Sequence, residues 1–169
     1  RFTNAFTNYL VKKYGKQFEE FNGANLIIER SIDAGKRGVL VHTRLIMPAT
    51  SPISVKWQVW EKNGAFKLID IIIEDISMLT MEREEIKNRL FLKGLNHYKL
   101  HEFYEAHEAW EDLWSDYYLE DRKFIQGLIQ LAVSFVHLEN NNLNGARSLI
   151  KKSREKFEIF SGVHRGINM

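Results

Sequence analysis

The pattern of hydrophobic and polar positions changes near residue 80. Before that point, short alternating runs are separated by Gly and Asn turns, and both prolines of the chain lie there. After it, apolar residues recur at every third or fourth position, which is the helical spacing. The sequence therefore predicts an α+β module over residues 1–80 and an all-helical module over 81–169. Met81 is a plausible former initiating methionine of a separate protein, so we expect a fusion of two modules.

The first module is predicted to be a helix followed by a four-stranded antiparallel meander. Helically spaced apolar residues predict a helix over 2–21, which Asn22 and Gly23 end. Asn63-Gly64 is a typical hairpin turn between two alternating runs. The strand-like runs cover residues 24–33, 37–47, 53–62 and 65–76.

The run that begins at Ile53 shows the alternation most clearly. One side carries Ile53, Val55, Trp57 and Val59, and the other carries Ser54, Lys56, Gln58 and Trp60. This pattern predicts one buried side and one mostly solvated side, as in antiparallel sheets. The run 71–73 is apolar throughout, which predicts a strand covered on both sides.

The titratable residues of the first module form no catalytic pattern. His42 is a lone histidine beside Arg44 on one side of a strand, and we expect an exposed or edge position for it. Asp70 and Glu74 are separated along their strand. We expect them to be sheet-surface charges rather than an acid/base pair.

Three segments of this module, Val55 to Val59, Asn63 to Asp70 and Glu74 to Met78, resemble the C-terminal part of the MlaC (toluene-tolerance) family. Phe66 stands where that family usually has Trp, and Asp75 where it usually has Gly. The resemblance covers residues 2–90. It implies a periplasmic carrier of phospholipid that exchanges its cargo with membrane-associated lipid-transport complexes. The N-terminal helices of that family are missing here. Because residue 1 is Arg rather than Met and the first residues have the pattern of a helix interior, we expect the N-terminus to be a cut.

The carrier mechanism implied by this resemblance is burial of acyl chains against the sheet and its neighbouring helices. A packed sheet core is the alternative for the same apolar residues, because a cavity cannot be read from a sequence. The candidate lipid-binding residues are Val55, Trp57, Val59, Leu68 and Ile72.

The second module is predicted to be a four-helix bundle without strands. The expected helices cover residues 82–99, 102–117, 121–140 and 143–160, with short connections between them. His97 and His101 lie near the end of the first of these helices, where a histidine favours the helix dipole, so we expect a capping role. Gly127 is expected to let a neighbouring helix come close.

A polar line crosses two of these helices. The helix over 121–140 is apolar nearly all round, yet three polar residues fall on one of its sides, and polar residues at the edge of the preceding helix are their expected partners. We refer to the line as the polar seam. It consists of His107, Glu108, Glu111, Gln126, Gln130 and His137.

Three interpretations of the polar seam remain open from the residues alone. It is an internal hydrogen-bond network that fixes the helix register. Alternatively, His107, Glu111 and His137 ligate a divalent metal, which would suit a metal-dependent hydrolase. In the third interpretation a small polar ligand or peptide binds beside the seam.

Segments Tyr104 to Trp114, Phe124 to Ala132 and Asn144 to Leu149 resemble the family called domain of unknown function 309. The resemblance covers residues 83–160 and implies an all-helical fold without an established reaction. The motif residues that it carries over are Glu105, His107, Glu108, Glu111, Trp114, Gln126, Gly127 and Gln130.

Composition narrows the function classes further. The net charge of the chain is +2, and neither module has the concentrated basic face that nucleic-acid binding needs, so no nucleic acid is expected. No apolar run reaches the ~18 residues of a membrane span. The chain has no cysteine, and no catalytic residue or cofactor is predicted.

These observations favour a non-enzymatic protein, a lipid-carrier-like module joined to a helical module of unknown role. The alternatives are a metal-binding helical protein and a helical protein-interaction module. If the first module sets the compartment, it is the periplasm; otherwise it is the cytoplasm.

Overall fold

The computed structural model of the chain describes residues 23–48 and 50–169. The chain divides into two compact units, Arg1–Glu82 and Arg83–Met169, and each is described here by itself. An antiparallel sheet is followed by four helices, which confirms the predicted α+β class. The helix predicted over residues 2–21 lies outside the described residues.

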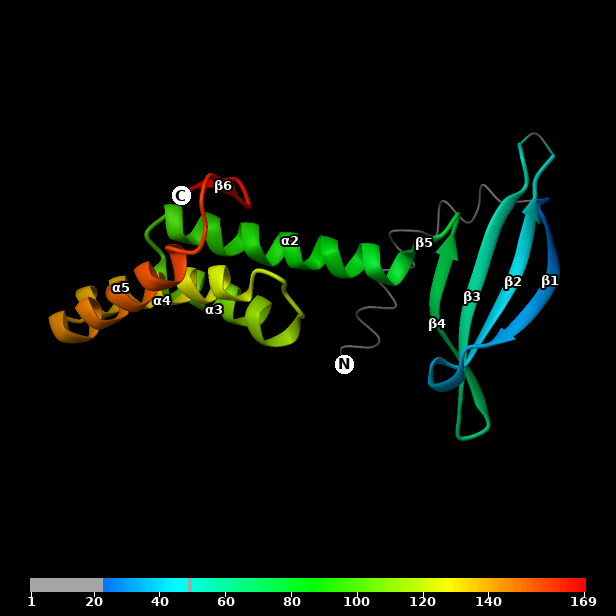
Figure 1. Cartoon of the computed structure of the whole chain (residues 1–169), viewed down its shortest axis with the longest axis horizontal. Coiled ribbons are helices and arrows are strands. Elements are labelled where there is room, and N and C mark those ends of the chain that lie inside the picture. The colour runs from blue at the N-terminus through cyan, green and yellow to red at the C-terminus, as the bar shows by residue number, and fades with distance from the viewer. Residues whose placement is uncertain (1–22, 49) are drawn as a thin grey trace. The chain divides into compact units, whose positions relative to one another are not determined.

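The first unit is built on a five-stranded sheet in which each strand pairs with its neighbour in sequence (Figure 1). All four pairings are antiparallel, so the sheet is a meander. A 3₁₀ turn, Gly35–Arg37, connects the first two strands. The strands are β1 (Asn25–Asp33), β2 (Val39–Ile46), β3 (Ile53–Lys62), β4 (Ala65–Ile73) and β5 (Ile76–Ser77).

The short last strand and a bulge in the first strand were not predicted. The β5 strand has only two residues, and it follows a turn in which Glu74 and Asp75 both have positive φ. The register also shifts in β1 between Ile28 and Arg30, so that Glu29 is an extra residue of a bulge. Because side chains alternate along a strand, this bulge moves the residues after it to the other side of the sheet.

Asp70 corrects one expectation from the sequence. It is 9% exposed rather than a surface charge, since it joins the sheet to the helix that follows. Its carboxylate accepts hydrogen bonds from Ser77 Oγ at 2.6 Å and from the backbone N–H of Leu79 at 2.9 Å. Ser77 Oγ in turn accepts from the N–H of Thr80 at 3.0 Å, as an N-cap residue does. Asp70 therefore fixes the start of this helix.

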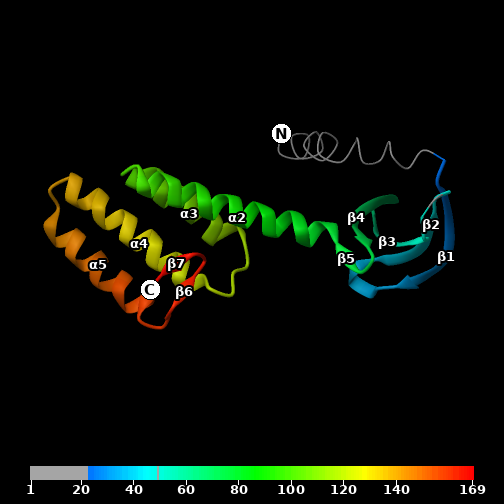
Figure 2. The same ribbon diagram turned by 90° about the horizontal axis from the view of Figure 1, so that it is seen from above.

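The second unit is predominantly helical. Its boundary falls inside α2 (Met78–Lys99), which begins four residues before the predicted start. The other helices are α3 (Phe103–Asp116), α4 (Arg122–Glu139) and α5 (Leu143–Phe157). Figure 2 shows α4 and α5 side by side. Within the described part of the chain, no helix is long and apolar enough to cross a membrane.

Trp110 on α3 lies at the centre of the helical core. Its side chain is 1% exposed, and its indole Nε1 donates to the carbonyl of Phe91 at 3.1 Å. The indole packs directly on Gly94, where a Cβ would come within 2.6 Å of two ring carbons. The sequence thus supplies a glycine on α2 where the large side chain of α3 needs the room.

The contact between α4 and α5 confirms the expectation for Gly127. A Cβ at this position would come within 2.7 Å of the Phe157 ring, so only glycine leaves room for it. The buried Ser153 Oγ donates to the Gly127 carbonyl at 2.8 Å. A small residue on each helix therefore brings the two helices together.

The prediction that residues 81–169 contain no strand is wrong. After α5 the chain forms a short hairpin of β6 (Val163–His164) and β7 (Ile167–Asn168). Its turn residues Arg165 and Gly166 both have positive φ, as in the tight turns that hairpins favour. The last helix accordingly ends at Phe157, three residues earlier than predicted.

Candidate functional site

One side of the sheet in the first unit is apolar over nearly its whole width. Residues directly opposite each other on paired strands share a side, so the register assigns every residue to one of the two sides. We call this side the apolar face. It carries Leu26 and Ile28 of β1, Val39, Val41, Thr43 and Leu45 of β2, Ile53, Val55, Trp57 and Val59 of β3, and Phe66, Leu68, Ile71 and Ile73 of β4. Ser31, Asp33 and Glu61, near the ends of their strands, are polar residues of the same side.

The apolar face is buried in its middle and exposed at its margins. Val55 is 5% exposed, whereas Ile28, Phe66 and Leu68 are 70%, 75% and 52% exposed. Contiguous exposed apolar surface on a protein generally marks a binding site. The face therefore has room for an apolar ligand or partner at its margins.

Four of the five residues proposed for lipid binding share this face: Val55, Trp57, Val59 and Leu68. Ile72 does not, because it pairs with Lys56 and lies on the opposite side. The bulge at Ile69, between Asp70 and Leu68 in the register, keeps Leu68 beside Val59. The sequence shows no signal for this bulge.

A hydrogen-bonded pair fixes the middle of the apolar face. Thr43 Oγ1 donates to the Val55 carbonyl at 2.8 Å and accepts from Trp57 Nε1 at 2.9 Å. Because these bonds satisfy the buried hydroxyl and the indole N–H, the Trp57 ring is held in one orientation with its carbon surface available for packing.

The opposite side of the sheet, which we call the polar face, has a polar middle formed by Arg30, His42, Arg44, Ser54, Lys56, Gln58 and Asp70. It also carries the apolar residues Ile27, Ile32, Leu40, Ile46, Trp60 and Ile72. Arg44 pairs with Glu29 at 2.5 Å, and Lys56 pairs with Asp75 of the β4–β5 turn. The Lys56 hydrogen bond and charge hold the pKa of Asp75 below its usual value. His42 is half-buried rather than exposed, and its Nε2 is buried without a hydrogen-bond partner.

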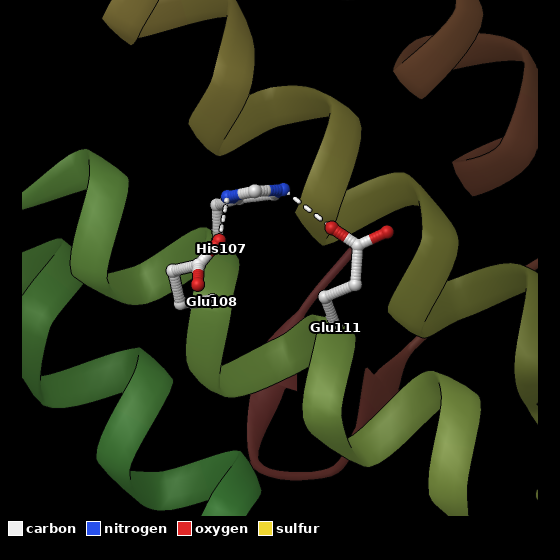
Figure 3. A group of neighbouring side chains, drawn as sticks. All are labelled: His107, Glu108 and Glu111. Carbon is white, nitrogen blue, oxygen red and sulfur yellow. Dashed lines mark ion pairs between the residues drawn. The ribbon is translucent and has the colours of Figure 1, made fainter.

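In the helical unit, α3 places His107 between two carboxylates (Figure 3). The imidazole Nε2 lies 2.5 Å from Glu111 Oε2, and Nδ1 lies 3.3 Å from Glu108 Oε1. The imidazole is 19% exposed, whereas both carboxylates are about half exposed. These residues form the group of ligand atoms within 4.8 Å of one another that could hold a metal ion in the described chain.

The remaining polar-seam residues do not join this group. His137 lies at the end of α4, and its Nδ1 is 3.1 Å from Asn142 Nδ2, the residue that caps α5. Gln126 and Gln130 are half-buried on α4, and Gln130 Oε1 is buried without a hydrogen-bond partner. No hydrogen bond joins these three residues to His107 or Glu111 among the described residues.

The histidines at the end of α2 have other contacts. His97 Nδ1 lies 2.6 Å from Glu102 Oε2, and His101 has a φ of 63° where the helix ends. The N–H of His101 donates to the Tyr98 carbonyl at 3.1 Å. Helices often end at a residue in this left-handed conformation.

Sequence reasoning missed a cleft of about 790 Å³ in the helical unit. Its walls come from α2, from the α3–α4 connection and from the C-terminal segment that includes the β6–β7 hairpin. The volume falls in the range of small-molecule sites. The lining residues are Glu84, Lys87, Asn88, Tyr118, Leu119, Glu120, Asp121, Phe160, His164 and Arg165.

Asp121 ties the hairpin to this cleft. Arg165 binds its carboxylate with two nitrogens, Nε and Nη2, and His164 Nε2 lies 3.0 Å from Oδ2. Burial alone would raise the pKa of Asp121, but the hydrogen bonds from Arg165 and His164 and the Arg165 charge outweigh it, so the pKa lies below its usual value. Arg165-Gly166 is not one of the usual hairpin dipeptides such as Asn-Gly, so the sequence carries no clear signal for this hairpin.

Two family models match the chain, and their ranges overlap at residues 91–98. The family described as MlaC protein matches residues 1–98, which is more than half of the chain. The chain belongs to the MlaC family. This confirms the resemblance to the family that the sequence indicated. The match lies at the N-terminal part, whereas the sequence indicated the C-terminal part of the family. Neither a curated protein nor a solved structure matches the chain significantly.

A second family, described as a domain of unknown function (DUF309), matches residues 91–149. This confirms the other resemblance. The match includes α3, α4 and the His107 group, and it ends before the C-terminal hairpin. Much of the cleft, namely its α2 residues and its C-terminal residues, therefore lies outside the matched range.

Proposed function

We propose that this member of the MlaC family is a periplasmic lipid carrier that binds phospholipid acyl chains on the apolar face of its sheet and exchanges them with membrane-associated lipid-transport complexes. The supporting observation is the continuity of the apolar face, from the buried Val55 to the exposed Ile28, Phe66 and Leu68. Acyl chains are long and flexible, and such a face can cover them along their length.

The energetic argument rests on the hydrophobic effect. Removing a methylene group from water contributes ~0.8 kcal/mol, so complete burial of an acyl chain of about 16 carbons contributes ~12 kcal/mol before the cost of ordering the chain. The protein also gains, because exposed side chains such as Ile28 and Leu68 become covered. Both contributions favour the loaded state.

A matched pair of variants on β1 tests the role of the apolar face. Ile28 and Ile32 are both exposed isoleucines of the same strand, at 70% and 44%, but the bulge at Glu29 places them on opposite sides of the sheet. We expect Ile28→Glu to reduce co-purifying phospholipid several-fold, because a carboxylate would contact the acyl chain. Ile32→Glu should leave the lipid content unchanged.

The measurement is mass spectrometry of organic extracts, with lipid quantified per mole of folded protein. Circular dichroism verifies that both variants keep their secondary structure. Absence of phospholipid from the unmodified protein, together with no uptake from added vesicles, would contradict the proposal. An equal loss in both variants would show that the face does not determine binding.

We propose a second function for the helical unit, binding of a divalent cation at His107. Its supporting observation is that both imidazole nitrogens face carboxylates, of Glu108 and Glu111. Whenever the imidazole is neutral, it donates from only one nitrogen, and the lone pair of the other nitrogen faces a negative charge. A cation on the Glu111 side would relieve this repulsion, and Glu108 would then orient the ring, as carboxylates do for metal-binding histidines.

Titration calorimetry with Zn²⁺ tests this second function. We expect His107→Asn to abolish binding and His97→Asn to leave it unchanged, because His97 has a single carboxylate partner, Glu102 at 2.6 Å. Elemental analysis of the unmodified protein supplies an independent measurement. Equal heats from the two variants would refute a site at His107.

A further inference from the structure

The polar face of the sheet carries a row of basic side chains that crosses three strands. Arg30 of β1 lies directly opposite His42 of β2, and His42 lies directly opposite Lys56 of β3. Directly opposed residues of antiparallel strands have Cβ atoms about 5 Å apart. Arg30 and Lys56 therefore flank His42 at distances that their long side chains can span.

Arg30 and Lys56 concentrate positive charge on the two sides of His42, which favours a negatively charged partner. The acidic groups near the row are already in use: Glu29 pairs with Arg44, Asp70 accepts from Ser77 and Leu79, and Glu74 Oε1 accepts from the N–H of Ser54.

Asp75 shows what the row can hold. Its carboxylate pairs with Lys56, whose hydrogen bond and charge lower the pKa of Asp75, and Lys56 lies directly opposite His42. The Asp75 side chain is 82% exposed. An external oxyanion can therefore replace this carboxylate by displacing an exposed side chain.

Two groups of the row remain unused. Arg30 makes no ion pair with another residue of the described ranges, and His42 Nε2 is a buried nitrogen without a hydrogen-bond partner. A buried polar atom without a partner is uncommon and calls for an explanation. A guanidinium binds phosphate oxygens with two parallel hydrogen bonds, so Arg30 can hold a phosphate group.

We propose that Arg30, His42 and Lys56 form a binding site for a phosphate group on the polar face of the sheet. Arg30 and Lys56 supply the charges, and displacement of Asp75 gives the phosphate access to His42. The group belongs either to free phosphate or to the headgroup of an anionic lipid at a membrane surface. The site lies on the side of the sheet opposite to the apolar face, so it does not depend on acyl-chain binding.

The test uses the full chain and two probes. Inorganic phosphate is titrated by calorimetry, and flotation is measured with vesicles of phosphatidylcholine alone or mixed with phosphatidylglycerol. We expect Arg30→Gln and Lys56→Gln each to weaken binding about tenfold, and Asp75→Asn to strengthen it, because Lys56 is then free. Lys67→Gln is the matched control, since Lys67 is exposed on the same side of the sheet but outside the row.

The two probes identify the source of the phosphate. Calorimetric binding without flotation indicates free phosphate, and flotation that requires phosphatidylglycerol indicates a lipid headgroup; either result supports the site if the row variants weaken it. Binding of neither probe, or an equal loss with Lys67→Gln, would overturn the proposal. Weaker binding by Asp75→Asn would also overturn it, because the carboxylate would then be helping rather than competing.

Discussion

Substitution of Gly94 sets helix propensity against packing. In an isolated helix, Gly→Ala stabilises by ~1 kcal/mol. In this structure the added Cβ would lie 2.6 Å from two carbons of the Trp110 indole, which is 1% exposed and hydrogen-bonded to the Phe91 carbonyl. Overpacking costs ~1–3 kcal/mol, and displacing the indole removes a hydrogen bond that contributes ~1 kcal/mol. We therefore expect Gly94→Ala to destabilise the protein by about 1–3 kcal/mol.

Urea unfolding followed by tryptophan fluorescence measures this change. The exposed neighbour Lys93→Ala is the control and should alter the unfolding free energy by less than about 0.5 kcal/mol. In a Trp110→Phe background the clash with the five-membered ring is absent, so the cost of Gly94→Ala should shrink by ~1 kcal/mol or more. Stabilisation by Gly94→Ala, or an unchanged cost in that background, would refute the packing argument.

Three further predictions concern the helical unit. The pKa of the Asp121 carboxylate is lowered in the folded protein, so the ionised group stabilises the fold above about pH 4 and this stabilisation is lost as pH falls through the folded-state pKa. The difference in unfolding free energy between wild type and Asp121→Asn should therefore shrink when unfolding is measured at decreasing pH. A difference that stays constant with pH would contradict this. Asn142→Ala removes the side chain that accepts from the Gly145 N–H at 2.9 Å, and should lower the unfolding free energy by ~1 kcal/mol, whereas no change in chemical denaturation would exclude a capping role. Ser153→Ala removes the buried hydrogen bond to the Gly127 carbonyl and should lower the unfolding free energy by ~1 kcal/mol. Hydrogen exchange should also show faster amide exchange in α4 and α5, and an unaltered exchange rate would count against this contact.

The long elements of the fold could be predicted because their patterns repeat over many residues. The alternation from Ile53 to Trp60 and the Asn63-Gly64 turn located the central hairpin, and helical spacing located α3 and α4. The two-residue strands β5 and β6 have no such repetition. Short strands depend on turn geometry, and at Arg165 that geometry requires a left-handed conformation in a residue that rarely adopts it.

In the candidate sites too, features that follow from regular spacing could be predicted, and those that depend on turns and bulges could not. Helical spacing brought His107 and Glu111 together correctly in the sequence, because residues four apart on a helix are neighbours. It could not show that His137 turns to Asn142, which depends on the α4–α5 connection. Nor could it show that Ile72 faces away from Leu68, since the bulge at Ile69 is set by pairing with β3.

Trp57 and Trp60 allow the most direct test of lipid binding on the apolar face. Trp57 lies on that face, and Trp60, three residues later on β3, lies on the polar face and is 40% exposed. Phospholipid with brominated acyl chains quenches tryptophan only at contact. We predict strong quenching in wild type and in Trp60→Phe, and loss of most of the quenching in Trp57→Phe. Undiminished quenching in Trp57→Phe would contradict acyl-chain binding on the apolar face.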